Sequence, residues 1–186
     1  MRAERAVEKV RERLLRTCRA LEGAGVPYVV IGGNAVAVWV GSRDEGAIRN
    51  TKDVDVLLNR ADLPSAEKAM SAAGFDMTEV EGLTMFLDRA DPMPSRGVHI
   101  LFAGEKIKPF DPYPAPPVVK GIRSPEGVDA IELRELLILK LIAFRDIDRV
   151  HIRDMIRVGL IDDALAEQIP TELRPRLEEI RADPDG

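Results

Sequence analysis

The stretch that decides the fold is residues 31–58, which read IGGNAVAVWVGSRDEGAIRNTKDVDVLL. It opens with a glycine pair, Gly32 and Gly33, followed by a short apolar segment and a polar loop. It closes with Asp53 and Asp55, which are separated by one valine in an otherwise apolar segment. Because side chains at positions i and i+2 of a strand point to the same face, the sequence predicts two carboxylates side by side on a core strand.

Two neighbouring carboxylates repel each other, and burial raises their pKa values unless a cation neutralises them. A hard divalent ion with oxygen ligands, Mg²⁺ or Mn²⁺, is the general solution, so Asp53 and Asp55 are candidate metal ligands. The alternative is a solvated strand edge, because aspartate is mostly exposed in proteins. The apolar neighbours Val54, Val56 and Leu57 favour a core strand.

The glycine pair follows a short apolar segment, YVVI (28–31), which is predicted to be a buried strand. Asn34 is a good N-cap and is expected to start a short helix over the apolar residues that follow. Free N–H groups at a helix start favour a phosphate, and glycines let the backbone approach it closely. Thr51, just before the aspartates, is expected at the same site. The alternative is an ordinary tight turn.

Hydrophobic periodicity and turn residues predict the remaining elements. Helices are expected at 3–22 and 63–73 and again from 133 onward, with a proline-rich surface loop at 105–127. Strands are expected at 28–31, 54–58, 75–80, 83–88, 97–104 and near 127–131. This order predicts an α+β fold. We expect one compact domain, in which a core with its N-terminal helix (1–132) carries a C-terminal helical region (133–186).

The composition limits the classes of function. The chain has 186 residues, a net charge of −5 and one cysteine, Cys18. A single cysteine excludes an intramolecular disulfide and a cysteine-based zinc cluster. The negative net charge gives no whole-molecule field for nucleic acid, so DNA is not expected as a partner, although a local basic patch remains possible. No apolar run reaches the ~20 residues of a membrane span. A soluble, cytoplasmic protein is expected.

The segments GGNAVAVW (32–39) and RNTKDVDVLL (49–58) resemble the nucleotidyltransferase superfamily of the DNA polymerase β type. The resemblance is greatest to its minimal bacterial branch, which includes the AbiEii-like toxins. It implies a mixed sheet flanked by helices, with a helical C-terminal region. It also implies that Gly32, Gly33 and Asn34 bind the triphosphate of an NTP and that the two aspartates hold Mg²⁺.

The resemblance extends to residues 132–155, ELRELLILKLIAFRDIDRVHIRDM, and covers roughly residues 25–160 in all. It implies that Lys140 neutralises phosphate charge and that Asp154 positions Lys140 or acts as a base. Lys140 lies among apolar residues, and a buried lysine needs an anionic partner. That partner is a nucleotide phosphate or a structural carboxylate such as Asp154. Arg145, Arg149 and Arg153 are expected at a solvated helix junction, or on phosphate if they face the site.

One position departs from the superfamily pattern. A third carboxylate usually lies on a later strand, and here the corresponding position of 97-GVHILFAGEK-106 is His99. An imidazole can ligate the metal or act as a base, and it can equally be a packed strand histidine. Glu105 and Asp154 are the alternative carboxylates. The other histidine, His151, is expected to pair with Asp154 at i+3 on a helix.

Three functions follow from these expectations. The first is Mg²⁺- or Mn²⁺-dependent transfer of an NMP group from an NTP to an unidentified acceptor, which the resemblance allows to be a protein, a tRNA or a small molecule. The chain would then be a candidate toxin with an antitoxin protein as partner. The second is a catalytically weakened nucleotide-binding or regulatory module, motivated by His99. The third is a structural interaction domain, which predicts no NTP binding.

Overall fold

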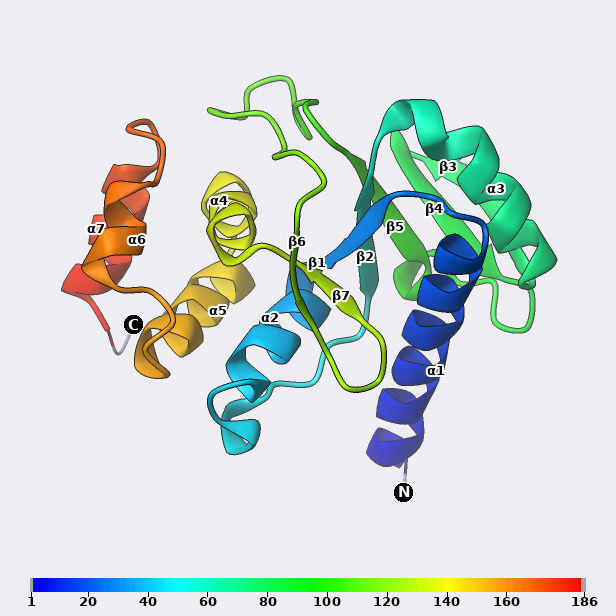
Figure 1. The fold of residues 1–186 in the computed structure, drawn as a ribbon, viewed down its shortest axis with the longest axis horizontal. Coiled ribbons are helices and arrows are strands. Elements are labelled where there is room, and N and C mark those ends of the chain that lie inside the picture. Colours follow the sequence, from blue (N-terminus) through cyan, green and yellow to red (C-terminus); the bar gives the residue numbers. More distant parts are fainter. Residues whose placement is uncertain (1, 185–186) are drawn as a thin grey trace.

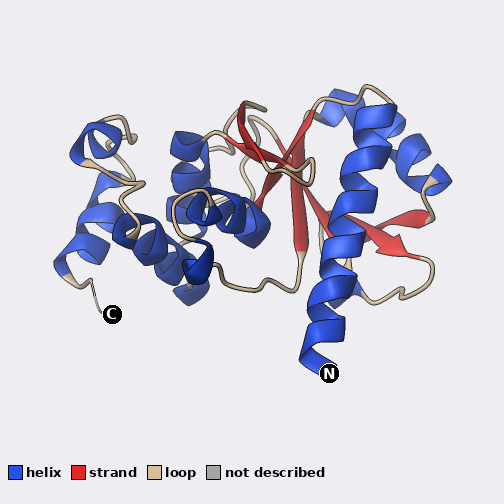
Figure 2. Ribbon diagram, turned by 60° about the horizontal axis from the view of Figure 1, so that its bottom comes forward, coloured by secondary structure: helices blue, strands red, loops and turns tan. Residues whose placement is uncertain are grey.

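The computed structural model describes residues 2–184, folded as a central sheet with helices on both faces (Figures 1 and 2). Its α-helices are α1 (Arg2–Gly23), α2 (Gly32–Gly41), α3 (Leu63–Ala72), α4 (Leu133–Ala143), α5 (Asp146–Arg157), α6 (Asp163–Glu167) and α7 (Arg174–Ala182). The strands are β1 (Tyr28–Ile31), β2 (Val54–Leu58), β3 (Phe75–Val80), β4 (Leu83–Asp88), β5 (Val98–Phe102), β6 (Lys120–Arg123) and β7 (Asp129–Ile131). Short 3-10 helices occupy η1 (Glu45–Ala47), η2 (Arg60–Asp62) and η3 (Pro94–Arg96).

The seven-stranded sheet has the order β3-β4-β5-β2-β1-β7-β6. It is mixed, because β2 runs parallel to β5 and antiparallel to β1, while β1 runs parallel to β7. Helices α1 and α3 pack on one face, and α2, α4 and α5 pack on the other. Helices α6 and α7 lie beyond α4 and α5, at the end of the molecule away from α1 (Figure 1).

Strand β2 shows how the sequence directs side chains to the two faces. Val54, Val56 and Leu58 are buried against α1 and α3, whereas Leu57 is buried in the cluster around α2 and α4. Asp55 alternates with Val54 and Val56, so its carboxylate faces the α2 side. The Asp55 side chain is 26% exposed, so its carboxylate keeps access to solvent and is tolerated in this strand.

The α+β class and nearly all of the expected elements are confirmed, with two differences. Helix α2 begins at Gly32 instead of Asn34, so the expected cap residue lies within the first turn. Strand β6 lies within the expected loop 105–127. It is a short edge strand on β7, and Gly121 is required in it because a Cβ there would lie 2.7 Å from the Cα of Glu132. The Lys-Gly-Ile-Arg sequence of β6 carries too little apolar pattern to reveal it.

The expected boundary at residue 132 coincides with the start of α4. The Glu132 carboxylate is the N-cap and accepts hydrogen bonds from the backbone N–H groups of Arg134 and Glu135. Side chains of α4, α5 and α7 share one apolar cluster with β1 and α2. The division into 1–132 and 133–186 stays a prediction. Among residues 2–184, no helix combines the length and apolar character needed to cross a membrane.

Candidate active site

Asp55 lies directly against the start of helix α2. In the β1–β2 ladder Asp55 is opposite Ile31, the residue before Gly32. Gly32 has φ +67°, and a Cβ on it would lie 2.0 Å from Oδ2 of Asp55. Only glycine adopts this backbone conformation without strain and also leaves room for the carboxylate. The first turn of α2 and the strand aspartate are thus in contact, as a phosphate site beside a metal site requires.

Asp53 precedes β2 and is fixed in place by two hydrogen bonds to its backbone carbonyl group. Its carbonyl oxygen accepts hydrogen bonds from Asn34 Nδ2 at 2.7 Å and from Thr51 Oγ1 at 3.3 Å. The side chain of Asn34 therefore ties α2 to the loop before β2 instead of capping the helix. The pKa of the Asp53 carboxyl is raised, first by burial and then by the charge of Asp55. A cation bound between the two carboxylates would relieve both effects.

The N-terminus of α2 has no side-chain cap. Its N-cap residue is Ile31, which cannot accept a hydrogen bond through its side chain, and the first turn contains no acidic residue. The first backbone N–H groups of a helix have no partner within the helix, and the helix dipole favours an anion there. A Cβ on Gly33 would lie 2.9 Å from Oγ1 of Thr51, so glycine also allows this close approach.

His99 is the direct neighbour of Asp55 on the adjacent parallel strand. The register pairs the two residues, and His99 Nδ1 lies 3.1 Å from Oδ1 of Asp55. The second ring nitrogen, Nε2, lies 3.4 Å from the carbonyl oxygen of Pro94. The hydrogen bond to Asp55 raises the pKa of His99. Both nitrogens have neighbours here, so the imidazole is placed to orient the Asp55 carboxylate.

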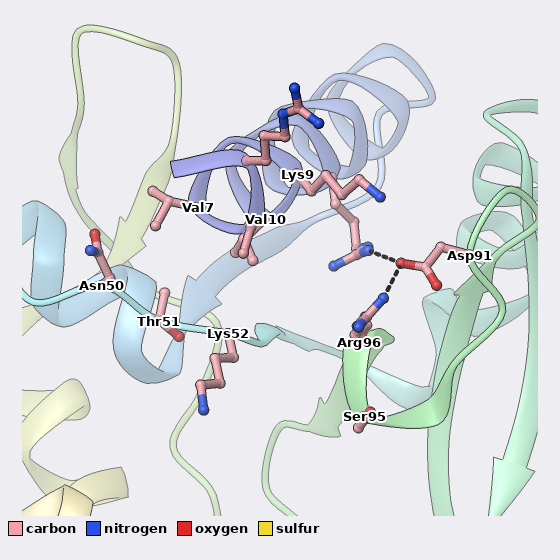
Figure 3. A pocket seen from close by; sticks show the side chains of 12 residues that line it. Val7, Lys9, Val10, Asn50, Thr51, Lys52, Asp91, Ser95 and Arg96 are labelled. Atoms are coloured by element: carbon pink, nitrogen blue, oxygen red, sulfur yellow. Dashed lines mark hydrogen bonds and ion pairs between the residues drawn. The ribbon is translucent and has the colours of Figure 1, made fainter. Parts of the chain in front are cut away.

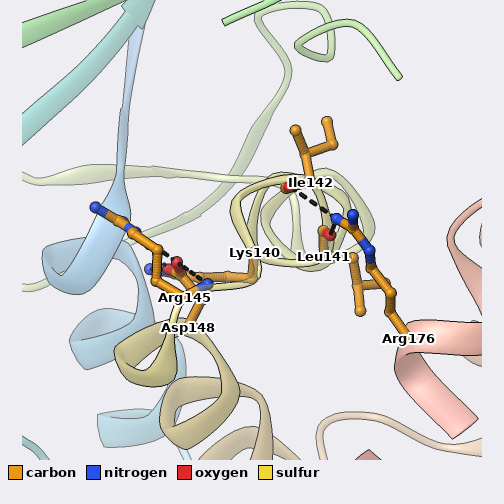
Figure 4. A network of polar contacts seen from close by, with 6 residues as sticks. All are labelled: Lys140, Leu141, Ile142, Arg145, Asp148 and Arg176. Carbon is orange, nitrogen blue, oxygen red and sulfur yellow. Dashed lines mark hydrogen bonds and ion pairs between the residues drawn. The ribbon is translucent and has the colours of Figure 1, made fainter. Parts of the chain in front are cut away.

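A network of three charged side chains joins α4 and α5 (Figure 4). Lys140 and Asp148 are 4% and 1% exposed, and Lys140 Nζ donates to Asp148 Oδ1 at 2.8 Å. Arg145, the N-cap residue of α5, donates from Nε to Asp148 Oδ2 at 2.7 Å. The pKa of Arg145 is raised mainly by Asp148, with contributions from Asp55 and Asp53. Arg145 is therefore the member of this network whose charge interacts with the aspartate pair.

The structure does not bring Lys140 and Asp154 together. Asp154 instead binds Arg49, with Nη2 at 3.2 Å from Oδ1, and Arg157, with Nη1 at 3.4 Å from the same atom. The suggested partnership of Lys140 with Asp154 is thus corrected, because Asp148 lies nearer on the same helix. Arg49 is two residues before Thr51, so its ion pair with Asp154 anchors the loop before β2 to α5.

The other polar candidates have partners elsewhere than at the aspartate pair. Arg149 pairs with Glu179 at 2.6 Å and stacks on Phe144, and Arg153 donates to the carbonyl oxygen of Asp183. Both arginines therefore contact the C-terminal segment. The carboxylate of Glu105 is bound by the Nε and Nη2 atoms of Arg60, at 2.6 Å and 2.7 Å.

His151 lies beside the glycine pair. Its Cε1 would be 3.6 Å from a Cβ on Gly33, and it is 7% exposed. Among the described residues, His151 makes no side-chain hydrogen bond to Asp154, so the expected pair is wrong. The Nδ1 atom of His151 is buried without a hydrogen-bond partner among these residues. Burial, followed by the charge of Lys140, lowers the pKa of His151 to about 4. A buried neutral imidazole with an unsatisfied nitrogen next to the start of α2 fits a polar ligand at that place.

We expect His151 to make folding stability depend on pH between about 4 and 6.5. In this window the unfolded chain binds a proton that the folded protein excludes, so stability falls as the pH falls. A drop of the pKa from 6.5 to about 4 corresponds to about 3 kcal/mol. Urea unfolding of wild type and of His151→Gln at pH 7 and pH 4.5 measures this effect. Between these pH values the free energy of unfolding should fall more for wild type than for His151→Gln.

His99→Gln is the matched control for this experiment. The folded-state pKa of His99 is raised, so its contribution to stability is complete below its unfolded pKa and is lost only as the pH rises through the folded value. The difference in the free energy of unfolding between wild type and His99→Gln should therefore stay constant from pH 6 to pH 4.5. Equal acid sensitivity of wild type and His151→Gln would contradict the burial of a neutral His151.

The donor set fits a divalent cation that is shared with a substrate. No group of three or more His, Cys, Asp or Glu side chains among the described residues forms a metal-binding cluster. Asp53 and Asp55 alone offer two carboxylates at the start of β2. Mg²⁺ is usually bound through one or two carboxylates together with substrate phosphates, and it keeps several waters. Two aspartates beside an uncapped helix start match this mode of binding.

Comparison with known proteins supports the fold. Two similar solved structures are the solution structure of the antibiotic-resistance factor ANT(2'')-Ia and the crystal structure of ANT(2'')-Ia in complex with adenylyl-2''-tobramycin. The first is 14% identical over 90% of each chain, with a TM-score of 0.54. The second is 14% identical over 91% of this chain and 92% of that chain, with a TM-score of 0.53. The fold is that of the polymerase β-like nucleotidyltransferases.

Sequence comparison is less informative. No family model matches the chain, and no curated protein matches it. The likeness to the ANT(2'')-Ia structures confirms the predicted fold and leaves the AbiEii-like branch a prediction.

Proposed function

We propose that the protein is a metal-dependent nucleotidyltransferase that moves an NMP group from an NTP to an acceptor hydroxyl. The observation that carries this proposal is the contact between Asp55 and the start of α2 at Gly32. A contact this close places a carboxylate ligand beside the N–H groups that would bind phosphate. The nucleotidyltransferase fold supports the same conclusion.

In the proposed reaction, Asp53 and Asp55 hold Mg²⁺ or Mn²⁺, and the backbone N–H groups of Gly32, Gly33 and Asn34 bind the phosphates. When bound, the divalent cation neutralises phosphate charge and makes the α-phosphorus a better electrophile. The acceptor oxygen forms a bond to the α-phosphorus while the bond between the α- and β-phosphates breaks. Pyrophosphate leaves with the electron pair, and the hydroxyl proton is released to water. The chain contributes positioning and electrostatic stabilisation.

Arg145 is the cation that we propose at the phosphates. It is the N-cap residue of α5, and its charge interacts with Asp53 and Asp55. Lys140, which the sequence predicts for this role, is ion-paired to Asp148 and acts through it by fixing Arg145. Thr51 and Asp154 are proposed as positioning residues, because Thr51 binds the Asp53 carbonyl and Asp154 anchors the same loop through Arg49.

His99 favours a second candidate function, a nucleotide-binding module with weakened catalysis. Its imidazole contacts Asp55 where the superfamily resemblance predicts a third carboxylate. A protonated imidazole in this position is a poor base for the acceptor hydroxyl and competes with a metal ion for the Asp55 carboxylate. This reading predicts metal-dependent NTP binding without transfer to any acceptor.

The experiment that tests the proposal uses each of the four NTPs labelled at the α-phosphate, with Mg²⁺ or Mn²⁺, in a lysate of the source cells. Wild type should attach label to an acceptor, whereas Asp53→Asn/Asp55→Asn should attach none. Calorimetric titration of the same NTPs separates the two candidates, since the weakened module binds without labelling. Label transfer by the double variant would refute the site.

The single variant Asp53→Asn serves as the folding control. Because the pKa of Asp53 is raised in the folded protein, the fold disfavours its ionised form at pH 7. Asp53→Asn should therefore be at least as stable as wild type. Loss of transfer with retained stability assigns the effect to the site.

Co-purification from the source cells would test the predicted antitoxin partner.

A further inference from the structure

A cavity of about 990 Å³ lies beside the proposed active site, between the N-terminal half of α1, the loop before β2 and the segment around η3 (Figure 3). Such a volume is at the upper end of the usual range for ligand pockets. The residues that line the cavity are Arg5, Ala6, Val7, Lys9, Val10, Arg13, Asn50, Thr51, Lys52, Asp91, Ser95 and Arg96.

The cavity is strongly basic, although the whole chain has a net charge of −5. Its lining contains five cationic side chains and one carboxylate, Asp91. Asp91 is already bound by Arg96, with Nη1 to Oδ2 at 2.8 Å. Among the described residues, the side chains of Arg5, Lys9 and Lys52 form no ion pair and no hydrogen bond. The lining therefore offers cationic groups that an anionic ligand can use.

Arg13 gives independent evidence of a binding site. It is 3% exposed, and its Nε atom is buried without a hydrogen-bond partner among the described residues. Its contact with Asp91 is long, with Nη2 at 3.9 Å from Oδ2. Burying a guanidinium with an unsatisfied N–H is costly. A phosphate accepts such donors well, because guanidinium and phosphate geometries match.

The cavity adjoins the proposed active site at two places. Its lining includes Thr51 and Lys52, the residues immediately before Asp53. It also includes Ser95 and Arg96, which follow Pro94, the residue whose carbonyl oxygen lies near His99. Strands β2 and β5 are parallel, so these two segments enter the sheet at the same edge. The cavity therefore borders the two segments that lead into Asp53 and His99.

We propose that this cavity binds the acceptor and that the acceptor carries phosphate close to the hydroxyl that is modified. The inference rests on the proposed nucleotidyl transfer and specifies its acceptor class. The solved neighbour was crystallised with adenylyl-2''-tobramycin, a derivative of a polycationic aminoglycoside. Five cationic side chains would repel such a molecule, so this chain discriminates against it. A nucleoside monophosphate and an RNA end both supply the required phosphate.

Binding of four probes tests this inference. They are a nucleoside monophosphate, a short 5'-phosphorylated oligoribonucleotide, tobramycin and a neutral methyl glucoside. Each is titrated in EDTA, so that the metal-dependent site makes no contribution. Arg5→Glu/Lys9→Glu reverses two cavity charges on α1 and should weaken binding of the phosphorylated probes about tenfold or more, with a smaller salt dependence. Mg²⁺-dependent NTP binding should not change.

Arg19→Glu/Lys68→Glu is the matched control, because both residues are exposed and lie outside the cavity lining. It changes the net charge equally and should leave probe binding unchanged. Equal weakening by both double variants, failure of both phosphorylated probes to bind, or preferential binding of tobramycin would overturn the inference. Binding of the monophosphate indicates a small acceptor, whereas binding of the oligoribonucleotide alone indicates an RNA end.

The two proposals fail in different ways. Acceptor binding without metal-dependent NTP binding would refute nucleotidyl transfer and leave the cavity as an anion site. NTP binding and transfer without binding of a phosphorylated probe would refute the acceptor class alone.

Discussion

Gly32→Ala should abolish metal-dependent nucleotide binding and should also lower the stability of the protein. Two separate costs act at this position. The left-handed backbone, with φ +67°, costs an alanine about 1–2 kcal/mol. In addition, the new Cβ would lie 2.0 Å from Oδ2 of Asp55, so the carboxylate must move. Displacing Asp55 removes a proposed metal ligand and disturbs its contact with His99.

Gly25→Ala separates the two costs. Gly25 has φ +65°, nearly the value at Gly32, but a Cβ on it would meet nothing within 4 Å. Gly25→Ala should therefore lose about 1–2 kcal/mol and bind nucleotide like wild type. Urea unfolding measures the stability of both variants, and calorimetry with NTP and Mg²⁺ measures their binding. Wild-type affinity in folded Gly32→Ala would contradict a site at this contact.

The geometry around Asp55 and Gly32 can be predicted from the sequence, because it is local to two adjacent strands, while the role of these residues stays a prediction. The carboxylate pair follows from strand alternation at Asp53 and Asp55, and the approach of Gly32 follows from a glycine at the end of the neighbouring strand. Strands β1, β2, β3 and β4 have the predicted bounds, since each is an apolar or alternating run flanked by turn residues. Strand β6 has no such run, so the sequence predicts a loop there.

Partners of the charged residues could not be predicted in the same way. The apolar setting of Lys140 indicates that it is buried and paired, but the choice between Asp148 and Asp154 depends on the turn between α4 and α5. That turn passes through Phe144 in the left-handed conformation, with φ 48°. It places Arg145 at the N-cap of α5 and Asp148 one turn into the helix, towards Lys140. The sequence does not predict this conformation, because phenylalanine rarely adopts positive φ.

The sequence does not predict the basic cavity, for a different reason. Its cationic side chains come from α1, from the loop before β2 and from the segment around η3, which are distant in the sequence. A net charge of −5 conceals a local surplus of positive charge. Only the packing of α1 along the sheet brings these side chains together.

The last prediction concerns the unequal roles of Lys140 and Asp148. Asp148→Asn should destabilise the protein by about 3–5 kcal/mol, because it leaves the buried ammonium of Lys140 without a carboxylate. Lys140→Met should cost less, about 1–3 kcal/mol, because Asp148 keeps its hydrogen bonds from Arg145 Nε at 2.7 Å and from the Arg145 backbone N–H at 3.2 Å. Urea unfolding of both variants checks this order.

Nucleotide binding by the same two variants decides how Lys140 acts. Asp148→Asn releases Arg145 and should weaken binding of NTP with Mg²⁺ about tenfold or more, since a charged contact to phosphate is worth about 1.5–3 kcal/mol. Lys140→Met leaves Arg145 attached to Asp148 and should bind nearly as wild type does. The double variant Lys140→Met/Asp148→Asn should recover stability relative to Asp148→Asn, because no buried charge is then unpaired, but it should not recover binding. If Lys140→Met folds and loses binding while Asp148→Asn retains it, Lys140 contacts the phosphates directly, as the sequence resemblance implies, and Arg145 does not.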